Sequence, residues 1–162
     1  MLEYRDAVSD DFRIIANFPQ NPVELFYMFP KGTYPVTPEQ LEETALVRYA
    51  PTVITQRGKV VGYCNLYDVT EGNDSWLGNV IVHPGFRRAG IGEFLLNSMK
   101  HRARSEYACR NLKLICHNTN TGALLFYYRH GFKPFDMKVM EDDKGSRIAG
   151  IIMSLDLGLK SD

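Results

Sequence analysis

The sequence is poor in cysteine and carries no net charge. Its 162 residues include three cysteines, and 19 Lys and Arg residues balance 19 Asp and Glu residues. An odd number of cysteines, without CxxC or Cys/His spacing, gives neither a disulfide framework nor a zinc site. A balanced charge supplies no overall field that would attract nucleic acid or an anionic membrane. We therefore expect reduced thiols, no metal, and no nucleic-acid or membrane partner.

Long hydrophobic runs are also missing. No segment approaches the run of about 18 apolar residues that a membrane-spanning helix requires, and the N-terminus has no basic region followed by an apolar stretch. These absences favour a cytoplasmic protein. The composition, 44% hydrophobic and 23% charged, is that of an ordinary globular protein of average domain length. We expect one domain over residues 1–162.

Hydrophobic periodicity and capping residues predict a mixed α/β protein. Thr37, Pro38 and Gln40 predict a helix that runs to about residue 49, and Ser9 is expected to cap an earlier short helix. Residues 18–36 mix aromatic residues with prolines and predict a short helix and loop. The other expected elements are strands at 2–5, 53–56, 60–67, 76–82, 112–116, 139–141 and 148–155, and helices starting at 90 and spanning 121–130.

The segment from Val80 to Gly92, VIVHPGFRRAGIG, predicts an anion-binding turn. It leads from a buried strand into a helix whose first turn contains two glycines. The first amide N–H groups of a helix have no partner within the helix, and the helix dipole adds about half a positive charge there. The glycines let an oxygen approach closely, while Arg87 and Arg88 add donors. Two negative groups, such as a diphosphate, fit this turn better than one.

Other glycine-rich patterns do not match this segment. A Walker motif requires Lys followed by Ser or Thr, whereas residue 93 is Glu. The dinucleotide fingerprint requires a third small residue where Leu95 stands. The remaining alternative is that the glycines only allow the helix to pack closely against the strand.

Two blocks of sequence together resemble the GCN5-related N-acetyltransferase family. The first is Arg87-Arg-Ala-Gly90-Ile-Gly92, which matches the pattern Arg/Gln-x-x-Gly-x-Gly/Ala and follows Val82-x-Pro84. The second is Asn120-x-x-Ala123-x-x-x-Tyr127-x-x-x-Gly131-Phe132. The resemblance implies a mixed, largely antiparallel central sheet flanked by helices, with a cofactor cleft between two splayed central strands.

The resemblance also implies acetyl-CoA as cofactor, with CoA as product. In similar proteins the amides of the turn wrap the diphosphate, and the preceding strand pairs with the pantetheine as if with another strand. Asn120 corresponds to a further cofactor contact, although a simple helix N-cap is an equal alternative. The expected cofactor-binding residues are Val80, Ile81, Val82, Arg87, Arg88, Ala89, Gly90, Ile91, Gly92, Asn120 and Tyr127.

Tyr127 stands where the family has the residue that protonates the departing thiolate. A phenol with a pKa of about 10 is a good hydrogen-bond donor to a developing thiolate. Only Tyr127 has the right offset from both Asn120 and Gly131. The alternative is a buried aromatic helix face, since Phe126 and Tyr128 flank it.

The family's usual glutamate base is absent. The matching positions are Trp76 and Ile115, neither of which can accept a proton from the amine. The remaining candidates are His117, Asp74, Asp68 and a chain of water molecules. His117 is our expected catalytic base, because it lies two residues after Ile115 on the same strand face.

The resemblance implies an N-acetyltransferase that acts by direct attack of an amine in a ternary complex. The acceptor is expected to be a small-molecule or peptide amine that contacts residues 18–49 and the 67–76 loop, with Glu24, Asp68, Glu71 or Asp74 meeting its charge. The main alternative function is a non-catalytic acyl-CoA-binding sensor module. A homodimer through the exposed edge of the final hairpin is a candidate assembly.

Overall fold

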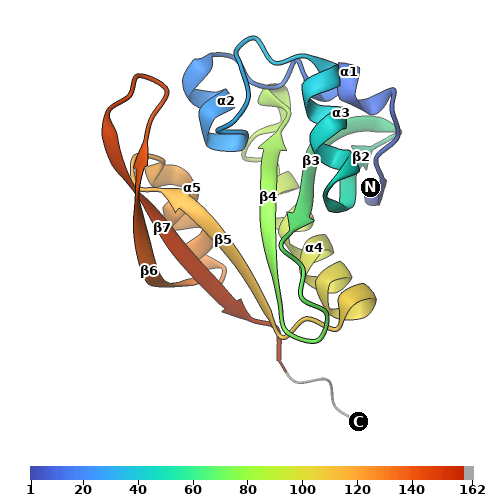
Figure 1. The fold of residues 1–162 in the computed structure, drawn as a ribbon. Helices are drawn as coiled ribbons and strands as arrows, with labels where there is room; N and C mark the ends of the chain where they lie inside the picture. The colour runs from blue at the N-terminus through green and yellow to red at the C-terminus, as the bar shows by residue number, and fades with distance from the viewer. Residues whose placement is uncertain (159–162) are drawn as a thin grey trace.

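The computed structural model describes residues 1–158, in which all seven strands form one sheet with the order β1-β2-β3-β4-β5-β7-β6 (Figure 1). Neighbouring strands are antiparallel except β4 and β5, which are parallel. The expected fold is therefore confirmed. The elements are β1 Leu2–Asp6, α1 Asp11–Ile15, α2 Pro22–Met28, α3 Pro38–Leu46, β2 Tyr49–Gln56, β3 Lys59–Tyr67, β4 Asp74–Val82, a 3-10 turn Pro84–Phe86, α4 Ile91–Tyr107, β5 Asn111–His117, α5 Thr121–Arg129, β6 Lys133–Glu141 and β7 Arg147–Asp156.

Several predicted elements have different ends. The helix opened by Thr37, whose hydroxyl accepts from the Gln40 N–H at 3.3 Å, ends at residue 46 rather than 49. The first helix has Asp10 rather than Ser9 at its N-cap position. The final hairpin begins at residue 133 rather than 139, because β6 is an edge strand and tolerates Pro134 near its start.

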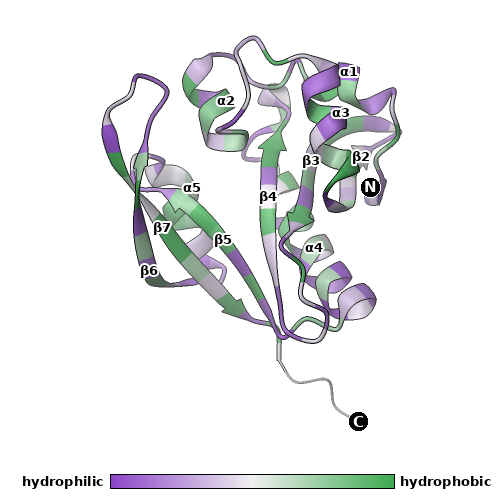
Figure 2. Ribbon diagram, viewed as in Figure 1, coloured by the Kyte–Doolittle hydropathy of each residue, from purple (hydrophilic) through white to green (hydrophobic). Residues whose placement is uncertain are grey.

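Helices cover both faces of the sheet and form two hydrophobic cores. Helices α4 and α5 lie on one face, where Leu95 and Met99 of α4 pack against inward-facing residues of the central strands. Helices α1, α2 and α3 lie on the other face, around Tyr63 and Val53. Figure 2 shows hydrophobic residues concentrated in the strands, whereas the loop at the tip of β6 and β7 is hydrophilic.

The parallel strands β4 and β5 separate along their length. They pair only where Asp74–Trp76 faces Asn111–Lys113, and from that point the two strands diverge (Figure 1). A bulge in β4 lies just beyond, because Tyr63 pairs with Ile81 while Asn65 pairs with Gly78. Asn79 in this bulge has a left-handed backbone with φ of 52°. A bulge bends its strand and sharpens the local twist, which opens the sheet between β4 and β5.

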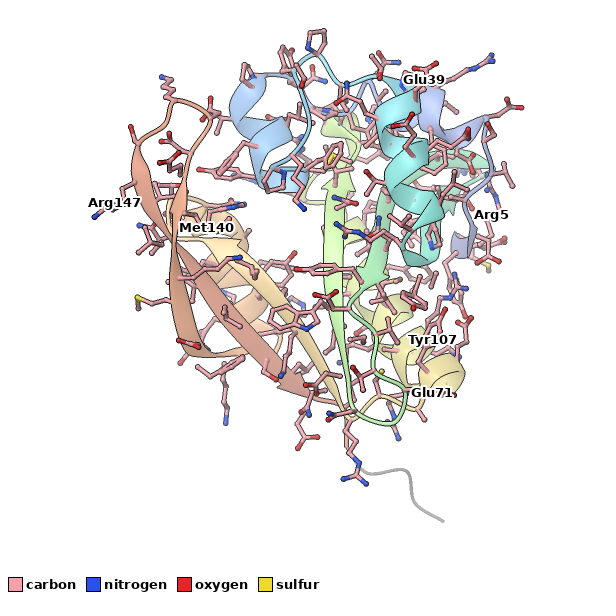
Figure 3. The ribbon with its side chains drawn as sticks, in the orientation of Figure 1. Arg5, Glu39, Glu71, Tyr107, Met140 and Arg147 are labelled. Carbon is pink, nitrogen blue, oxygen red and sulfur yellow. The ribbon has the colours of Figure 1, made fainter. Side chains whose placement is uncertain are left out.

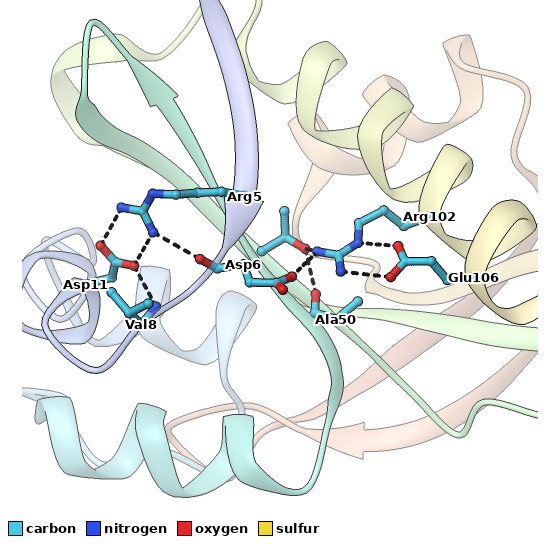
Figure 4. A network of polar contacts seen from close by, with 8 residues as sticks. Arg5, Asp6, Val8, Asp11, Ala50, Arg102 and Glu106 are labelled. Atoms are coloured by element: carbon cyan, nitrogen blue, oxygen red, sulfur yellow. Dashed lines mark hydrogen bonds and ion pairs between the residues drawn. The ribbon is translucent and has the colours of Figure 1, made fainter.

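A polar network fixes α4 to the N-terminal strands (Figure 4). The buried Arg102 side chain donates to the Glu106 carboxylate at 2.6 and 3.0 Å and to the Thr52 hydroxyl at 2.8 Å. It also forms an ion pair with Asp6 at 2.7 Å. These contacts hold the C-terminal half of α4 in place, and thereby help to position the N-terminal turn of the same helix.

Candidate active site

A cleft of about 1700 Å³ occupies the space between the separated strands. Its walls come from β4, β5, α2, α5 and the turn before α4, with contributions from α3 and the segment after it, from the end of β3 and from β6. The residues expected from the sequence that line it are Val80, Ile81, Val82, Arg87, Arg88, Gly90, Gly92, His117, Asn120 and Tyr127. The structure thus gathers nearly all of them around one cavity.

The turn before α4 presents free amide groups to this cleft. Arg88 and Gly90 both have left-handed backbones, with φ of 63° and 82°. Among residues 1–158, no backbone carbonyl accepts from the N–H groups of residues 88–92, which run from the turn into the first residues of the 17-residue helix α4. A Cβ at Gly90 would meet no atom within 4 Å, and one at Gly92 would lie 3.5 Å from the Phe126 ring. Successive free amides of this kind form a concave site for an anion.

Arg87 is engaged elsewhere. Its guanidinium donates to both carboxylate oxygens of Glu24 on α2, at 2.7 and 3.1 Å. This pairing holds the pKa of Glu24 below its usual range. Arg87 therefore ties α2 to the turn, and Glu24 is not a free carboxylate for an acceptor amine.

Ala89 and Ile91 contribute only main chain to the turn. Neither side chain lines the cleft, and the Ile91 side chain is buried in the core beneath α4. Their expected role in cofactor binding therefore depends on their amide groups.

The side of β4 that faces β5 is an open strand edge. Beyond Trp76, no residue of β5 pairs with β4 in the part of the chain that the structure describes. The segment Val80–Val82 lines the cleft along this edge. Unpaired main-chain donors and acceptors can pair with an extended chain such as pantetheine.

Asn120 and Tyr127 lie on the α5 side of the cleft. Asn120 occupies the N-cap position of α5, but its side chain makes no capping hydrogen bond, which leaves it free to contact a ligand. Tyr127 packs edge-on against Phe126 and Phe132, with ring centroids 5.5 Å apart in each case. Burial, with the Cys116 and Cys64 thiols nearby, raises the pKa of Tyr127 well above its usual value. Tyr127 therefore keeps its proton at neutral pH, and its hydroxyl is available as a hydrogen-bond donor.

His117 lies at the end of β5 against α2. Its side chain is 4% exposed, and its ring centroid is 4.5 Å from that of Phe26 and 5.7 Å from that of Tyr27. Its buried Nε2 has no hydrogen-bond partner among residues 1–158. Burial and the charge of Lys138 lower the pKa of His117, so the ring is neutral at pH 7 and can accept a proton.

The acidic candidates lie in different places: Asp74 and Asp68 were expected as possible bases, and Glu71 as a possible partner for the charge of the acceptor. Asp74 is bound by Lys113 at 2.7 Å where β4 and β5 meet, and it does not line the cleft. Glu71 also lies outside the cleft, at the closed end of the sheet near Tyr107 (Figure 3). Asp68 is exposed and lines the cleft. Asp68 and His117 therefore remain as the side-chain candidates for the base that accepts the proton of the amine.

Cys116 also faces the cleft, as a buried thiol. Burial raises its pKa to about 11. A thiol with a raised pKa is a poor nucleophile at neutral pH, because the thiolate is the reactive form. An acetyl-cysteine route is therefore disfavoured.

Residues 18–49 were expected to contact the acceptor, but Arg48 among them was not identified as a functional residue. Arg48, between α3 and β2, reaches over β4 at Gly78 and stacks on the Tyr67 ring at 4.3 Å. The available signal was Gly78 itself, since a glycine within a strand often marks a bulge or a close approach.

The chain belongs to the acetyltransferase (GNAT) family, whose model matches residues 7–132. This family uses acetyl-CoA as acetyl donor to amine acceptors, and the chain is accordingly an acetyl-CoA-dependent acetyltransferase. The free amides and the two glycines of the turn fit the diphosphate of that cofactor, and the open edge of β4 fits its extended pantetheine chain.

Solved structures share the fold. The ribosomal-protein-S18-alanine N-acetyltransferase of Escherichia coli is 20% identical with a TM-score of 0.77, over 100% of this chain and 97% of its own. The ribosomal-protein-alanine N-acetyltransferase of Brucella melitensis is 21% identical with a TM-score of 0.78, over 95% and 99%. The Salmonella typhimurium protein yncA, solved with its cofactor acetyl-CoA, is 18% identical with a TM-score of 0.74, over 100% and 97%.

Within residues 1–158, no helix is long and apolar enough to cross a membrane. The same residues contain no group of three or more His, Cys, Asp or Glu side chains that could hold a metal ion.

Proposed function

We propose that the cleft between β4 and β5 transfers the acetyl group of acetyl-CoA directly to an amine in a ternary complex. The observation that carries this proposal is the run of free amides at residues 88–92, which faces the same cleft as Tyr127 and the open edge of β4. The thioester of the bound cofactor supplies the activated acetyl group.

The turn amides, the Arg88 charge and the α4 dipole hold the diphosphate. The main chain of Val80–Val82 holds the pantetheine in an extended form along β4, and the free Asn120 side chain adds a contact from α5. Tyr127 donates its phenolic proton to the sulfur that leaves, so that CoA departs as the thiol. The raised pKa of Tyr127 keeps the phenol protonated, so that its hydroxyl is present as a hydrogen-bond donor to the developing thiolate.

His117 receives the proton of the acceptor amine through its unpartnered Nε2, directly or through one water molecule. The lowered pKa supports this role, because a neutral imidazole is available at pH 7. The burial of His117 against α2 favours a purely structural role instead, and a pH profile separates the two.

The acceptor is a small-molecule or peptide amine that enters between α2, α3 and β6. Two solved neighbours are named for transfer to the alanine of a ribosomal protein, which supports a peptide N-terminus as one candidate. The three free cysteines support a cytoplasmic location. We also propose that the one domain formed by this chain assembles as a homodimer through the exposed β6 side of the sheet.

The test is release of CoA thiol from acetyl-CoA across a panel of amines, alongside calorimetric titration of acetyl-CoA. We expect binding of acetyl-CoA and amine-dependent thiol release. Binding without thiol release for every amine would overturn the catalytic proposal in favour of an acyl-CoA sensor. Absence of binding would overturn both.

A further inference from the structure

The guanidinium of Arg48 is a half-buried cation in the wall of the cleft. Its Nη1 donates to the Asn65 amide oxygen at 3.0 Å, which is its only side-chain hydrogen bond within residues 1–158. No carboxylate in that part of the chain lies within 4.0 Å of it; Asp68 contributes only at longer range. Four of its five N–H donors thus have no protein partner within residues 1–158, and they are available to a ligand in the cleft.

The surroundings of Arg48 hold it in one place. Its guanidinium stacks on Tyr67, and a Cβ at Gly78 would overlap its Nη1 and lie 2.9 Å from the Tyr67 ring. The absence of a side chain at residue 78 therefore leaves the space that the guanidinium fills. A rigid, stacked guanidinium is well suited to bind a carboxylate through two parallel hydrogen bonds.

Arg48 is also linked to the bulge of β4. Asn65, which accepts from Arg48, donates to the Asn79 side chain at 2.7 Å, and Asn79 in turn donates to the Met28 carbonyl at 3.0 Å. Asn79 directly precedes Val80, where the proposed pantetheine edge begins. A group bound by Arg48 would therefore lie beside the cofactor strand, on the α2 and α3 side of the cleft.

The unpaired charges that line the cleft are mainly positive. Lys31 and Lys138 line the cleft with Arg48, and neither forms an ion pair in the described residues. Glu24 is neutralised by Arg87, so that among the described residues lining the cleft Asp68 is the only unpaired carboxylate apart from Glu93 at the α4 turn. Such a field repels polyamines and other polycations, and attracts an acceptor with a negative group.

We propose that Arg48 binds a carboxylate on the acceptor, so that the substrate is an amine that also carries a carboxylate close to its nucleophilic nitrogen. This inference rests on the proposed acetyl transfer and specifies its acceptor. The carboxylate can belong to a free amino acid or to an acidic peptide, and both would make the same two hydrogen bonds with the guanidinium.

The experiment compares matched acceptors in the wild type and in Arg48→Gln. One pair is an α-amino acid and its carboxamide, and a second pair is a tripeptide with Asp or Asn at its second position. We expect Arg48→Gln to lower kcat/KM for the carboxylate member of the preferred pair by roughly 10- to 100-fold, the usual loss for a hydrogen bond between charged groups. Its carboxamide partner should change by less than about threefold, because it lacks the charge that Arg48 recognises. The pair that responds identifies the source of the carboxylate.

Three controls sharpen the result. Arg104→Gln makes the same change of charge at an exposed position of α4 outside the cleft and should leave every kcat/KM value unchanged. Arg48→Lys keeps the charge without the planar fork and should recover part of the loss. Calorimetric affinity for acetyl-CoA should be the same in all variants. Equal losses for carboxylate and carboxamide acceptors would overturn the proposal, because they would indicate that Arg48 only supports the bulge.

A binding measurement keeps this inference separate from the proposed function. Calorimetric titration of the responding carboxylate acceptor into the CoA-saturated protein should give a dissociation constant that rises about tenfold or more in Arg48→Gln. That result would support the carboxylate site even in a protein that releases no thiol. An unchanged dissociation constant would overturn the carboxylate site even in an active acetyltransferase.

Discussion

The environment of the Tyr127 hydroxyl favours its protonated form, and we therefore expect the hydroxyl to contribute to turnover. Burial raises its pKa, so it can donate to a developing thiolate but cannot act as a base at neutral pH. Tyr127→Phe should lower kcat by about 10²- to 10³-fold with little change in acetyl-CoA affinity, since one proton donor supplies about that much. Thiol release and calorimetry measure the two quantities. Tyr128→Phe, at a 65% exposed position, is the control, and equal losses in both would point to packing.

The lowered pKa of His117 predicts the direction in which kcat/KM changes with pH. Its folded-state pKa lies below 6.5, so the neutral, proton-accepting form is present above that pKa and is lost as the pH falls through it. If His117 is the base, kcat/KM should rise with pH along a limb below pH 6.5 that stays in place for every acceptor. His117→Gln should remove this limb. A limb that instead follows the pKa of each acceptor amine would assign proton removal to water.

Tyr127 and Arg48 show why single residues were predictable only in part. Tyr127 could be found because its role is tied to fixed offsets from Asn120 and Gly131 within one helix. Arg48 reaches the cleft from another part of the chain and depends on the missing side chain of Gly78. The sequence therefore placed Arg48 only within the broad range 18–49, and Gly78 marks a close approach without identifying the side chain that fills the space.

At the scale of elements, strands and helices were predicted well where side-chain periodicity decides the structure. The strand β6 was missed over residues 133–138, although Phe135, Met137 and Val139 alternate with polar residues. Pro134 argues against a central strand, but β6 is an edge strand and needs no amide donor on its outer side. The side chains of its alternating apolar face are exposed, so burial could not have identified them either.

The role of the turn before α4 can be tested by a substitution at Gly92. Gly92→Asp places a negative side chain in the cleft among the free amides, and should weaken acetyl-CoA binding by well over tenfold because it repels and obstructs the diphosphate. Calorimetry on the folded variant measures the effect.

Gly92→Ala is the matched variant for this turn. Its Cβ would lie at an ordinary contact distance of 3.5 Å from Phe126, so the fold should tolerate it with a smaller loss of affinity. Wild-type affinity in a folded Gly92→Asp protein would show that the diphosphate binds elsewhere.

At the scale of the whole molecule, the order of elements in the sequence predicted the sheet and its cleft. It did not predict that α2 packs against the end of β5 at one side of the cleft. The Tyr27 hydroxyl of α2 donates to the Thr119 hydroxyl at 2.9 Å, and the Tyr27 ring stacks on His117. The hydrogen bond joins residues 92 positions apart, and both contacts bring α2 against the end of β5. The sequence predicted that residues 18–49 contact the acceptor, but not which strand they would meet.

An apolar groove lies on the outer side of α5 and β6 and shares no lining residue with the cleft. The groove has a volume of about 720 Å³, and Leu125, Tyr128, Phe135 and Met137 on its walls are each between 47% and 65% exposed. A continuous apolar patch beside an unpaired strand edge is typical of a protein interface. A second copy of the chain can cover both features through a two-fold contact.

The homodimer proposal therefore predicts a concentration-dependent dimer in light scattering. Met137→Glu puts a charge in the centre of the groove and should shift the protein towards the monomer, because that charge would be buried without a partner. Acetyl-CoA affinity should not change, since Met137 does not line the cleft, whereas its neighbour Lys138 does. Arg147→Gln, an exposed change of one charge near the tip of the hairpin, should leave the dimer intact (Figure 3). A wild-type protein that remains monomeric at every concentration would contradict the proposal, as would a Met137→Glu protein that still forms the dimer.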